Sequence, residues 1–571
     1  MSHSSTTDHD VCIIGSGAGG GPVAYELARA GYDVVVLEKG KWLTEKEYFK
    51  DEMACCIKES YLADKRTEPH VVETEKGDGW RVRKTSESGW NLWNGNVVGG
   101  SSNFMSGFFH RLKPVDFRLL SEFGPIDGAE MADWPITYDD LEPYYDKVER
   151  IIGVSGKVVA HKFQEPRSSK DFPYPPTREH PLAAMIDAAC KKIGTTAIPL
   201  PRAILSRPDH GRRACEYSGY CGGLGCASGA KGSSRAALLD RAVASGHCTV
   251  LPQSHVKRIT SDGSGRITGV EYVDRDGKAR RIDARIYVVA CQAIETARLL
   301  LNSTGPKYPR GLANRSGLVG KHLMFAGGGA GSGRIDYADF DERTATLLRD
   351  NGPFINRTIH DHYIIDDPDF GARAKGGVID FVHLHPNPIG RAYGRVTKGD
   401  RLRWGSELKR DLEGYFRGGR YIKIEAFCDW LPNPDSFVRL DPAVRDRYGM
   451  PVARARFGFH VRNLQVGWYL AAKGAEVLRA MGAKNVVSFA SGSPPTNLVA
   501  GTCRFGDDPE KSVLDADCRS HEVENLYITD GSFMPNAGSA PFTWTIYANA
   551  FRVADRIIAA LGGRPDDTAR T

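Results

Sequence analysis

The order of apolar and polar residues predicts an α/β fold that begins close to the N-terminus. Residues 11–14 read VCII, a short apolar run typical of a buried parallel strand. Residues 22–31, PVAYELARAG, follow as an amphipathic helix that ends at Gly31. Residues 34–37, VVVL, are a second buried strand that runs into Glu38. This strand–turn–helix–strand order indicates a parallel sheet covered by helices.

The same reasoning predicts elements in four later stretches. Residues 285–303 are expected to form a strand that enters a helix through a turn of small residues, and residues 525–561 a strand, an Asp-Gly turn, a loop and a long closing helix. Strands are also predicted within residues 251–259 and 376–386. By contrast, the Pro- and Gly-rich stretches near 165–180 and 350–375 are expected to be surface loops.

The turn between the first strand and helix carries a dinucleotide-binding pattern, G-x-G-x-x-G, at Gly15, Gly17 and Gly20. Gly15 is expected to make the tight turn, Gly17 to admit a pyrophosphate, and Gly20 to let the helix pack closely on the strand. Glu38 lies 18 positions after Gly20, where an acidic side chain can accept hydrogen bonds from a ribose. The pattern alone does not distinguish NAD from FAD.

Length, composition and net charge limit the class of protein but do not indicate a reaction. The 571 residues are sufficient for two domains, and the net charge of +6 is dispersed, which argues against a nucleic-acid partner. No apolar run is long enough to span a membrane, and the first residues lack the pattern of a signal peptide. We therefore expect a cytoplasmic protein whose twelve cysteines are reduced or act as ligands.

Four separated motifs, in this order, resemble the glucose–methanol–choline (GMC) family of FAD oxidoreductases over essentially the whole chain. They are the N-terminal glycine pattern, NVVGGSSNFMSG, VVACQAIETARLL and ITDGSFMP with TIYANAFRVADRI. Two further stretches, 215–234 and 429–457, are similar to the subgroup that includes gluconate and sorbitol dehydrogenases. The resemblance implies a Rossmann-like FAD-binding domain, interleaved with an α+β substrate domain whose sheet roofs the flavin.

The resemblance also implies domain boundaries and cofactor contacts. The FAD-binding domain would comprise residues 1–115, 211–330 and 490–571, and the substrate domain residues 116–210 and 331–489. The loop at 97–107 would run over the flavin, and it lacks the histidine to which some relatives attach FAD, so non-covalent FAD is expected. Besides the residues of the glycine pattern and Glu38, the implied FAD contacts are Gly99, Gly100, Ser101, Ser102, Asn103, Val256, Ala290, Asp530, Gly531 and Thr545.

The expected catalytic histidine is missing. Family members place it a few residues before the Gly-Thr that stands here at 501–502, where this chain has Asn497 and Leu498. No histidine or asparagine occurs in the second expected position, within residues 539–544. An alternative base could come from the roof, where His383 and His385 share one face of the predicted strand. Asn497 could still donate a hydrogen bond to a substrate oxygen.

Three functions remain open at this point. The first is oxidation of a hydroxyl group of a sugar, glycoside or polyol by hydride transfer to flavin N5. The second is a flavin-dependent lyase or isomerase reaction without net oxidation, and the third is a non-catalytic FAD-binding partner subunit. An electron-acceptor protein or small subunit is a possible partner of the first.

Three cysteines lie close together in the sequence, at Cys215, Cys221 and Cys226. Some dehydrogenases of the similar subgroup hold an iron–sulfur cluster with cysteines in this region, and thiolates are its usual ligands. The alternatives are a reduced, buried cysteine loop or a disulfide. No other metal site is predicted.

Overall fold

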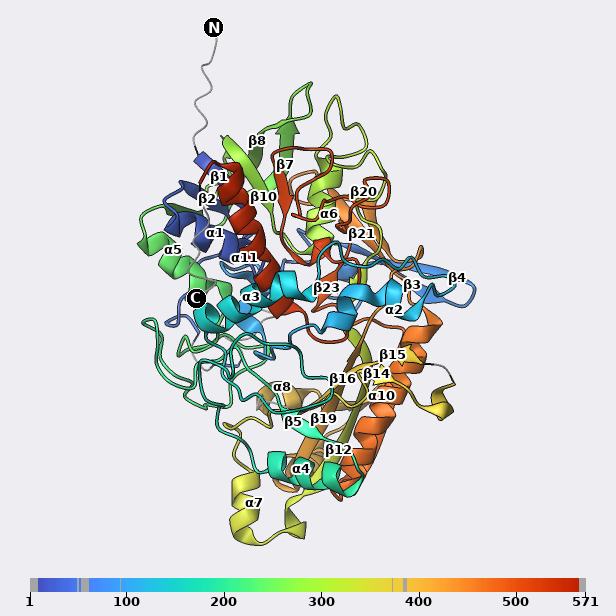
Figure 1. Cartoon of the computed structure of the whole chain (residues 1–571). Helices are drawn as coiled ribbons and strands as arrows, with labels where there is room; N and C mark the ends of the chain where they lie inside the picture. Colours follow the sequence, from blue (N-terminus) through green and yellow to red (C-terminus); the bar gives the residue numbers. More distant parts are fainter. Residues whose placement is uncertain are drawn as a thin grey trace.

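A five-stranded parallel sheet organises one half of the molecule, in the upper part of Figure 1. The computed structural model describes residues 9–48, 51–52, 61–92, 94–371, 373–383 and 388–563. The strand order is β24-β10-β1-β2-β6, and the strands are β1 (His9–Ile14), β2 (Val34–Leu37), β6 (Cys248–Leu251), β10 (Ala284–Val289) and β24 (Leu526–Ile528). Segments far apart in the chain therefore meet edge to edge in one sheet.

This sheet forms as predicted because its strands are short apolar runs that helices can cover on both faces. Helix α1 (Gly20–Arg29) ends where Gly31 takes a φ of +85°, and it packs against α11 (Thr543–Ala560). Helix α6 (Ala293–Asn302) follows β10, as expected from the sequence. Helices α11 and α3 (Tyr138–Val148) pack together on the same side as α1.

A six-stranded antiparallel sheet, called the roof sheet below, organises the lower half of Figure 1. Its order is β22-β12-β19-β16-β13-β5. The strands are β5 (Ala197–Pro199), β12 (Gly327–Asp336), β13 (Arg357–Ile359), β16 (Gly377–His383), β19 (Gly419–Cys428) and β22 (Lys484–Ala490). Helix α10 (Val461–Ala480) covers one face, over a core of aliphatic side chains from β16 and β19. The other face is free to meet the parallel-sheet half.

Smaller sheets and helices complete the fold. Three-stranded and four-stranded sheets are formed by β7 (His255–Ser261), β8 (Ile267–Val273) and β9 (Ala279–Ile282), and by β3 (Val71–Lys76), β4 (Gly79–Lys84), β20 (Phe437–Arg445) and β21 (Pro451–Phe457). Two-stranded pairs are β11 (Met324–Phe325) with β23 (Val499–Ala500), β14 (Ile364–Ile365) with β15 (Ala374–Lys375), and β17 (Thr397–Lys398) with β18 (Arg401–Leu402). The remaining helices are α2 (Leu119–Phe123), α4 (Leu182–Lys192), α5 (Asp240–Ala244), α7 (Glu342–Leu348), α8 (Pro388–Tyr393) and α9 (Gly405–Arg417). In the part of the chain that the structure describes, no helix combines the length and apolar character needed to cross a bilayer.

One sequence prediction about this architecture is wrong. The stretch 350–375 is not simply a surface loop, because it contributes β13 to the roof sheet and buries Phe354 and Ile355. Its Pro and Gly residues flank strands of only two or three residues, which are too short to show a period in the sequence. The α/β class and the strands predicted within 285–303, 376–386 and 525–561 are confirmed.

Candidate active site

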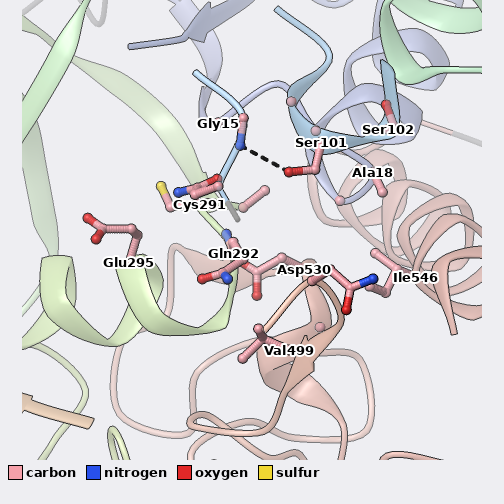
Figure 2. Close-up of a pocket in the computed structure, with 18 of the residues that line it drawn as sticks. Gly15, Ala18, Ser101, Ser102, Cys291, Gln292, Glu295, Val499, Asp530 and Ile546 are labelled. Carbon is pink, nitrogen blue, oxygen red and sulfur yellow. Dashed lines mark hydrogen bonds between the residues drawn. The ribbon is translucent and has the colours of Figure 1, made fainter. Parts of the chain in front are cut away.

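A cavity of about 730 Å³ lies between the carboxyl ends of the parallel strands and the free face of the roof sheet. Figure 2 shows side chains from the first turn, from the loop at Ser101 and Ser102, from α6 and from the C-terminal segment around this space. The strand order reverses at β1, and ligands of open α/β sheets bind at the carboxyl ends of strands at such a point. The cavity is large enough for a cofactor and a small substrate.

The glycine turn has the geometry that its sequence predicted. Gly15 has a φ of +97°, and a Cβ atom there would lie 2.3 Å from the carbonyl oxygen of Ala290. A Cβ on Gly20 would lie 2.0 Å from the carbonyl oxygen of Gly15, so Gly20 serves close helix packing and does not line the cavity. Gly17 lines the cavity, and a Cβ there would meet no atom within 4 Å. Backbone at Gly17 is therefore open to a ligand.

Glu38 stands at the end of β2 and lines the same cavity. Its carboxylate accepts hydrogen bonds from the Ser16 hydroxyl at 2.5 Å and from the backbone N–H of Gly40 at 2.8 Å. Burial raises the pKa of the Glu38 carboxyl, while the Ser16 and Gly40 hydrogen bonds act in the opposite direction. The Ser16 hydroxyl also accepts from the N–H of Gly99, which joins the glycine turn to the next loop.

The loop at 97–107 contributes to the cavity through some of its predicted residues. Gly100, Ser101 and Ser102 line the cavity, whereas Gly99 and Asn103 lie behind the lining. The Asn103 amide donates to the carbonyl oxygens of Val98 and Gly100, at 2.9 and 3.0 Å, so this side chain shapes the loop instead of facing a ligand.

The later motifs supply the opposite wall. Val256, Ala290, Asp530 and Gly531 line the cavity. Thr545 does not, because its hydroxyl is buried and hydrogen-bonded to that of Tyr145 at 2.7 Å. The structure therefore gathers most predicted cofactor contacts around one space and assigns Thr545 to packing within the helix layer.

Asp530 ties the C-terminal wall to the start of α6. Its carboxylate accepts from the Gln292 N–H at 3.1 Å, from the Thr296 hydroxyl at 2.5 Å, and from both the N–H and the hydroxyl of Ser532. Burial raises the pKa of Asp530, and these donors oppose that rise. Backbone N–H groups and hydroxyls from the start of α6 and from the turn at Ser532 therefore hold the carboxylate in place.

Sequence reasoning missed a buried ionic cluster beside the nucleotide end of the cavity. Lys39, Glu295 and Arg298 line the cavity, and Glu295 pairs with Arg298 at 3.2 Å and with His70. Burial opposes ionisation of Glu295, but the guanidinium of Arg298 and the hydrogen bond with His70 outweigh it and hold its pKa well below the usual range. The signal was present, since Glu295 lies inside the VVACQAIETARLL motif.

The segment that precedes the Gly-Thr pair is held at the cavity by that pair. Gly501 has a φ of +76°, and its N–H donates to the Gly531 carbonyl at 3.0 Å. The Thr502 hydroxyl donates to the Ala293 carbonyl at 2.8 Å. As a result Asn497 and Leu498 both line the cavity, as expected for the slot in which the catalytic histidine was sought.

The roof histidine does not reach this cavity. His383 pairs in register with Ile422, which is fully buried in the core under α10, and cross-strand partners share a face. Its Nε2 instead lies 2.8 Å from the Pro353 carbonyl oxygen. The residues of β16 that face the cavity alternate with His383 along the strand. The position of His383 therefore does not support the expectation that it is the base. His385 lies outside the described residues.

Two side chains that were not predicted from the sequence lie on the cavity face of the roof sheet. Lys423 and Glu425 alternate with Ile422, Ile424 and Ala426 along β19, so they point away from the core and line the cavity. Phe427 continues the same row and packs near Ala540. The alternation in the sequence GRYIKIEAFC was the available signal.

The three cysteines of the predicted cluster lie in a loop apart from the main cavity. Cys215, Cys221 and Cys226 line a separate, small cavity of about 30 Å³ and pack against Tyr174, Ile204 and Phe354. All three are free thiols, and the described residues contain no group of three or more His, Cys, Asp or Glu side chains that could hold a metal ion. The iron–sulfur alternative is thus not supported, and the reduced cysteine loop accounts for these residues.

Known proteins are similar to this chain over nearly its whole length. Two models of the family described as GMC oxidoreductase match residues 82–326 and 432–550. The chain is similar to 6'''-hydroxyparomomycin C oxidase of Streptomyces lividus, with 33% identity over 97% of this chain and 92% of the relative. It is 32% identical to 2-methyl-1,2-propanediol dehydrogenase of Mycolicibacterium austroafricanum, over 97% and 96% of the two chains. Among solved structures, a formate oxidase variant of Aspergillus oryzae RIB40, studied for its FAD modification, aligns with a TM-score of 0.64 at 15% identity, over 97% of this chain and 99% of that one.

Proposed function

The chain belongs to the GMC oxidoreductase family, and from this premise we propose that it oxidises a hydroxyl group of a sugar, glycoside or polyol with FAD as electron acceptor. Two relatives named above act on a hydroxyparomomycin and on a propanediol, both of which carry hydroxyl groups. The observation that carries the proposal is the single cavity that joins the dinucleotide-type turn to the polar face of the roof sheet.

The residues present fit FAD. Gly17 leaves a cradle that any Cβ would fill, and it lies at the N-terminal end of α1, where the helix dipole favours a phosphate. Glu38 offers carboxylate oxygens to a ribose at the end of β2. Residues from α6 and from the turn at Asp530 would enclose the remainder of the dinucleotide.

We expect FAD to be held without a covalent bond. The loop that lines the cavity reads Ser101-Ser102-Asn103-Phe104 and offers no histidine for attachment. Acid precipitation of the protein should therefore release the yellow flavin into the supernatant, whereas a covalent bond would leave it in the pellet.

The chain's own residues would bind and orient the substrate at the roof end of the cavity. When bound, FAD supplies a two-electron acceptor for the hydride that leaves the substrate carbon. Asn497 can donate a hydrogen bond to the substrate oxygen, and Phe427 and Phe108 provide apolar walls that exclude water. The first turn of α11 also lines the cavity, and its partial positive charge favours negative charge nearby.

The test is anaerobic mixing of the purified yellow protein with a panel of sugars, glycosides and polyols, while flavin absorbance is followed. Bleaching by one compound class, with a product two hydrogens lighter, is the expected result. A flavin that dithionite reduces but that no compound bleaches would contradict the proposal.

A lyase or isomerase reaction without net oxidation is the second candidate. It is favoured by one observation, the absence of a base at Asn497 and Leu498 in the slot where family members carry histidine. A product whose mass excludes loss of two hydrogens, formed without flavin bleaching, would select this candidate.

A further inference from the structure

Strand β19 of the roof sheet has one face in the core and the other toward the cavity. Its residues alternate strictly: Ile422, Ile424 and Ala426 are at most 2% exposed, in the core beneath α10. The intervening side chains of Lys423, Glu425 and Phe427 line the cavity. Phe427 packs against a cluster that contains Ala540, within the stretch 539–544 where the second catalytic side chain of the family was sought. Glu425 lies two residues before Phe427, so both side chains are on the cavity face of β19.

Few titratable side chains in this cavity could accept a proton from a substrate. Most of those among the described lining residues belong to the nucleotide end, at or beyond the carboxyl ends of the parallel strands; they are Glu38, Lys39, His255, Lys257, Cys291, Glu295, Arg298 and Asp530. The roof sheet contributes Lys423 and Glu425. A lysine is positively charged near neutral pH, so Glu425 is the roof group able to act as a base.

The surroundings of Glu425 adjust its affinity for a proton. Lys423 Nζ lies 3.4 Å from its Oε1 on the same strand. Across the strand pair, Glu425 stands directly opposite Asp380 of β16, a fully buried carboxylate whose Oδ2 lies 3.1 Å from His110 Nε2. On the other side, β12 presents the uncharged Ala330. The guanidinium of Arg202 is a further positive charge that lowers the pKa of Glu425.

These groups leave Glu425 more basic than an ordinary glutamate. Burial is the largest cause and raises the pKa of its carboxyl; Lys423 lowers it, Asp380 raises it, and Arg202 lowers it, with a net rise. A carboxylate whose pKa is displaced toward neutrality is a better general base than one that is fully solvated. About a third of the Glu425 side chain remains exposed, so a substrate hydroxyl can approach it.

Building on the proposed function, we propose that Glu425 is the catalytic base that takes the proton of the substrate hydroxyl. The O–H bond breaks and its proton goes to a Glu425 carboxylate oxygen. Bound FAD would supply the oxidant: the hydrogen on the carbon that bears this hydroxyl would leave with its electron pair, and a C=O bond would form. Lys423 stabilises the negative charge that develops on the substrate oxygen, and Asp380 with His110 act as positioning residues. The proton on Glu425 then returns to solvent.

The test compares Glu425→Gln, Glu425→Asp and a matched control, Glu413→Gln, on the exposed surface of α9. We expect Glu425→Gln to lower the rate constant of flavin reduction about 100-fold or more, the scale of lost general-base catalysis. Glu425→Asp should restore part of the rate, and Glu413→Gln should match the wild type. In the wild type the rate should rise with pH as the Glu425 carboxyl ionises, and this rise should be absent in Glu425→Gln.

Four further measurements separate a base from a structural residue. FAD content and thermal midpoint should be unchanged in Glu425→Gln, and affinity for the ketone or aldehyde product, read from flavin absorbance, should stay within threefold. Infrared difference spectra between acidic and neutral pH should contain a carboxyl band that is absent in Glu425→Gln. A changed product affinity with an unchanged reduction rate would show that Glu425 only recognises substrate.

The outcomes distinguish this inference from the proposed function. If the wild type is bleached and Glu425→Gln is bleached at the same rate, the inference is overturned and the proposed function stands. If Glu425→Gln loses only amino-substituted substrates and oxidises neutral polyols normally, the carboxylate binds an ammonium and is not the base. If no compound bleaches even the wild type, the proposed function fails and this inference fails with it.

Discussion

The two ends of the cavity are built in different ways. At the nucleotide end, ligand-facing groups are backbone turns and side chains at the ends of parallel strands, such as Gly17 and Glu38, and neighbouring N–H groups hold them. At the roof end, the groups are side chains in the middle of an antiparallel strand, Lys423 and Glu425, and the pKa of Glu425 depends on burial, on Lys423 and on Asp380 across the sheet. The nucleotide end therefore depends on backbone conformation, which few substitutions can preserve. The chemistry of the roof end can change through single side-chain substitutions.

The largest effect that this comparison predicts is at Gly15. Gly15→Ala places a Cβ 2.3 Å from the Ala290 carbonyl oxygen, at a φ of +97°, so something must shift. We expect the free energy of unfolding to fall by about 3 kcal/mol, and the purified protein to contain little flavin. Urea denaturation and the flavin-to-protein absorbance ratio measure both effects.

Gly17→Ala is the matched control, because its new Cβ meets no protein atom within 4 Å. The unfolding free energy of the flavin-free protein should change by less than about 0.5 kcal/mol, while affinity for FAD falls. Equal destabilisation by both substitutions would show that the turn has no special backbone requirement at Gly15.

A smaller effect is expected at Asp429, just after β19. Burial raises the pKa of its carboxyl to about 6, against the opposing charge of Lys375. Because this lies above the value of about 3.9 in an unfolded chain, the folded state binds the proton more tightly. The resulting stabilisation is complete at low pH and is lost as pH rises through about 6.

Asp429→Asn should remove this pH dependence. Between pH 5 and pH 7 the wild type should lose about 1 kcal/mol of unfolding free energy relative to the variant. Urea denaturation at both pH values measures the difference, and Asp276→Asn, on an exposed turn, is the control. A difference that does not vary with pH would mean that Asp429 titrates at the same pH in both states.

The smallest effect on pH dependence is expected at Lys423, whose side chain is 41% exposed. Its ammonium lowers the pKa of Glu425, so Lys423→Met should move the pH midpoint of flavin reduction upward. Stopped-flow reduction across pH measures this shift, and flavin content should stay at the wild-type level. A shift toward lower pH would contradict the assigned interaction between the two side chains.

The sequence was informative where function depends on local backbone. Gly15, Gly17 and Glu38 lie within one strand–turn–helix–strand unit, so their spacing alone predicts their arrangement. The implied contacts at Ser101, Ala290 and Asp530 also line the cavity. Thr545 and Asn103 lie behind the lining, because proximity in a motif does not show which side chains face a ligand and which support it.

The roof could be predicted only in part. A strand at 376–386 was expected, but the face that His383 presents depends on pairing with β19, from a segment about forty residues later. Shifting by one residue reverses every side chain in a strand, so the choice between His383 and its neighbours needs the register. Glu425 carries no motif, and its alternation becomes meaningful only once the core side of the sheet is known.

The parallel sheet also has a consequence for how the protein is made. Strand β10 pairs with β24, which the ribosome delivers more than two hundred residues later, and Asp530 follows only after that. Contacts of such sequence separation form late and slow the folding of a chain. The nascent polypeptide therefore has no finished cofactor pocket until nearly all of it has emerged, and FAD is expected to be captured after synthesis and to lock the last strand in place.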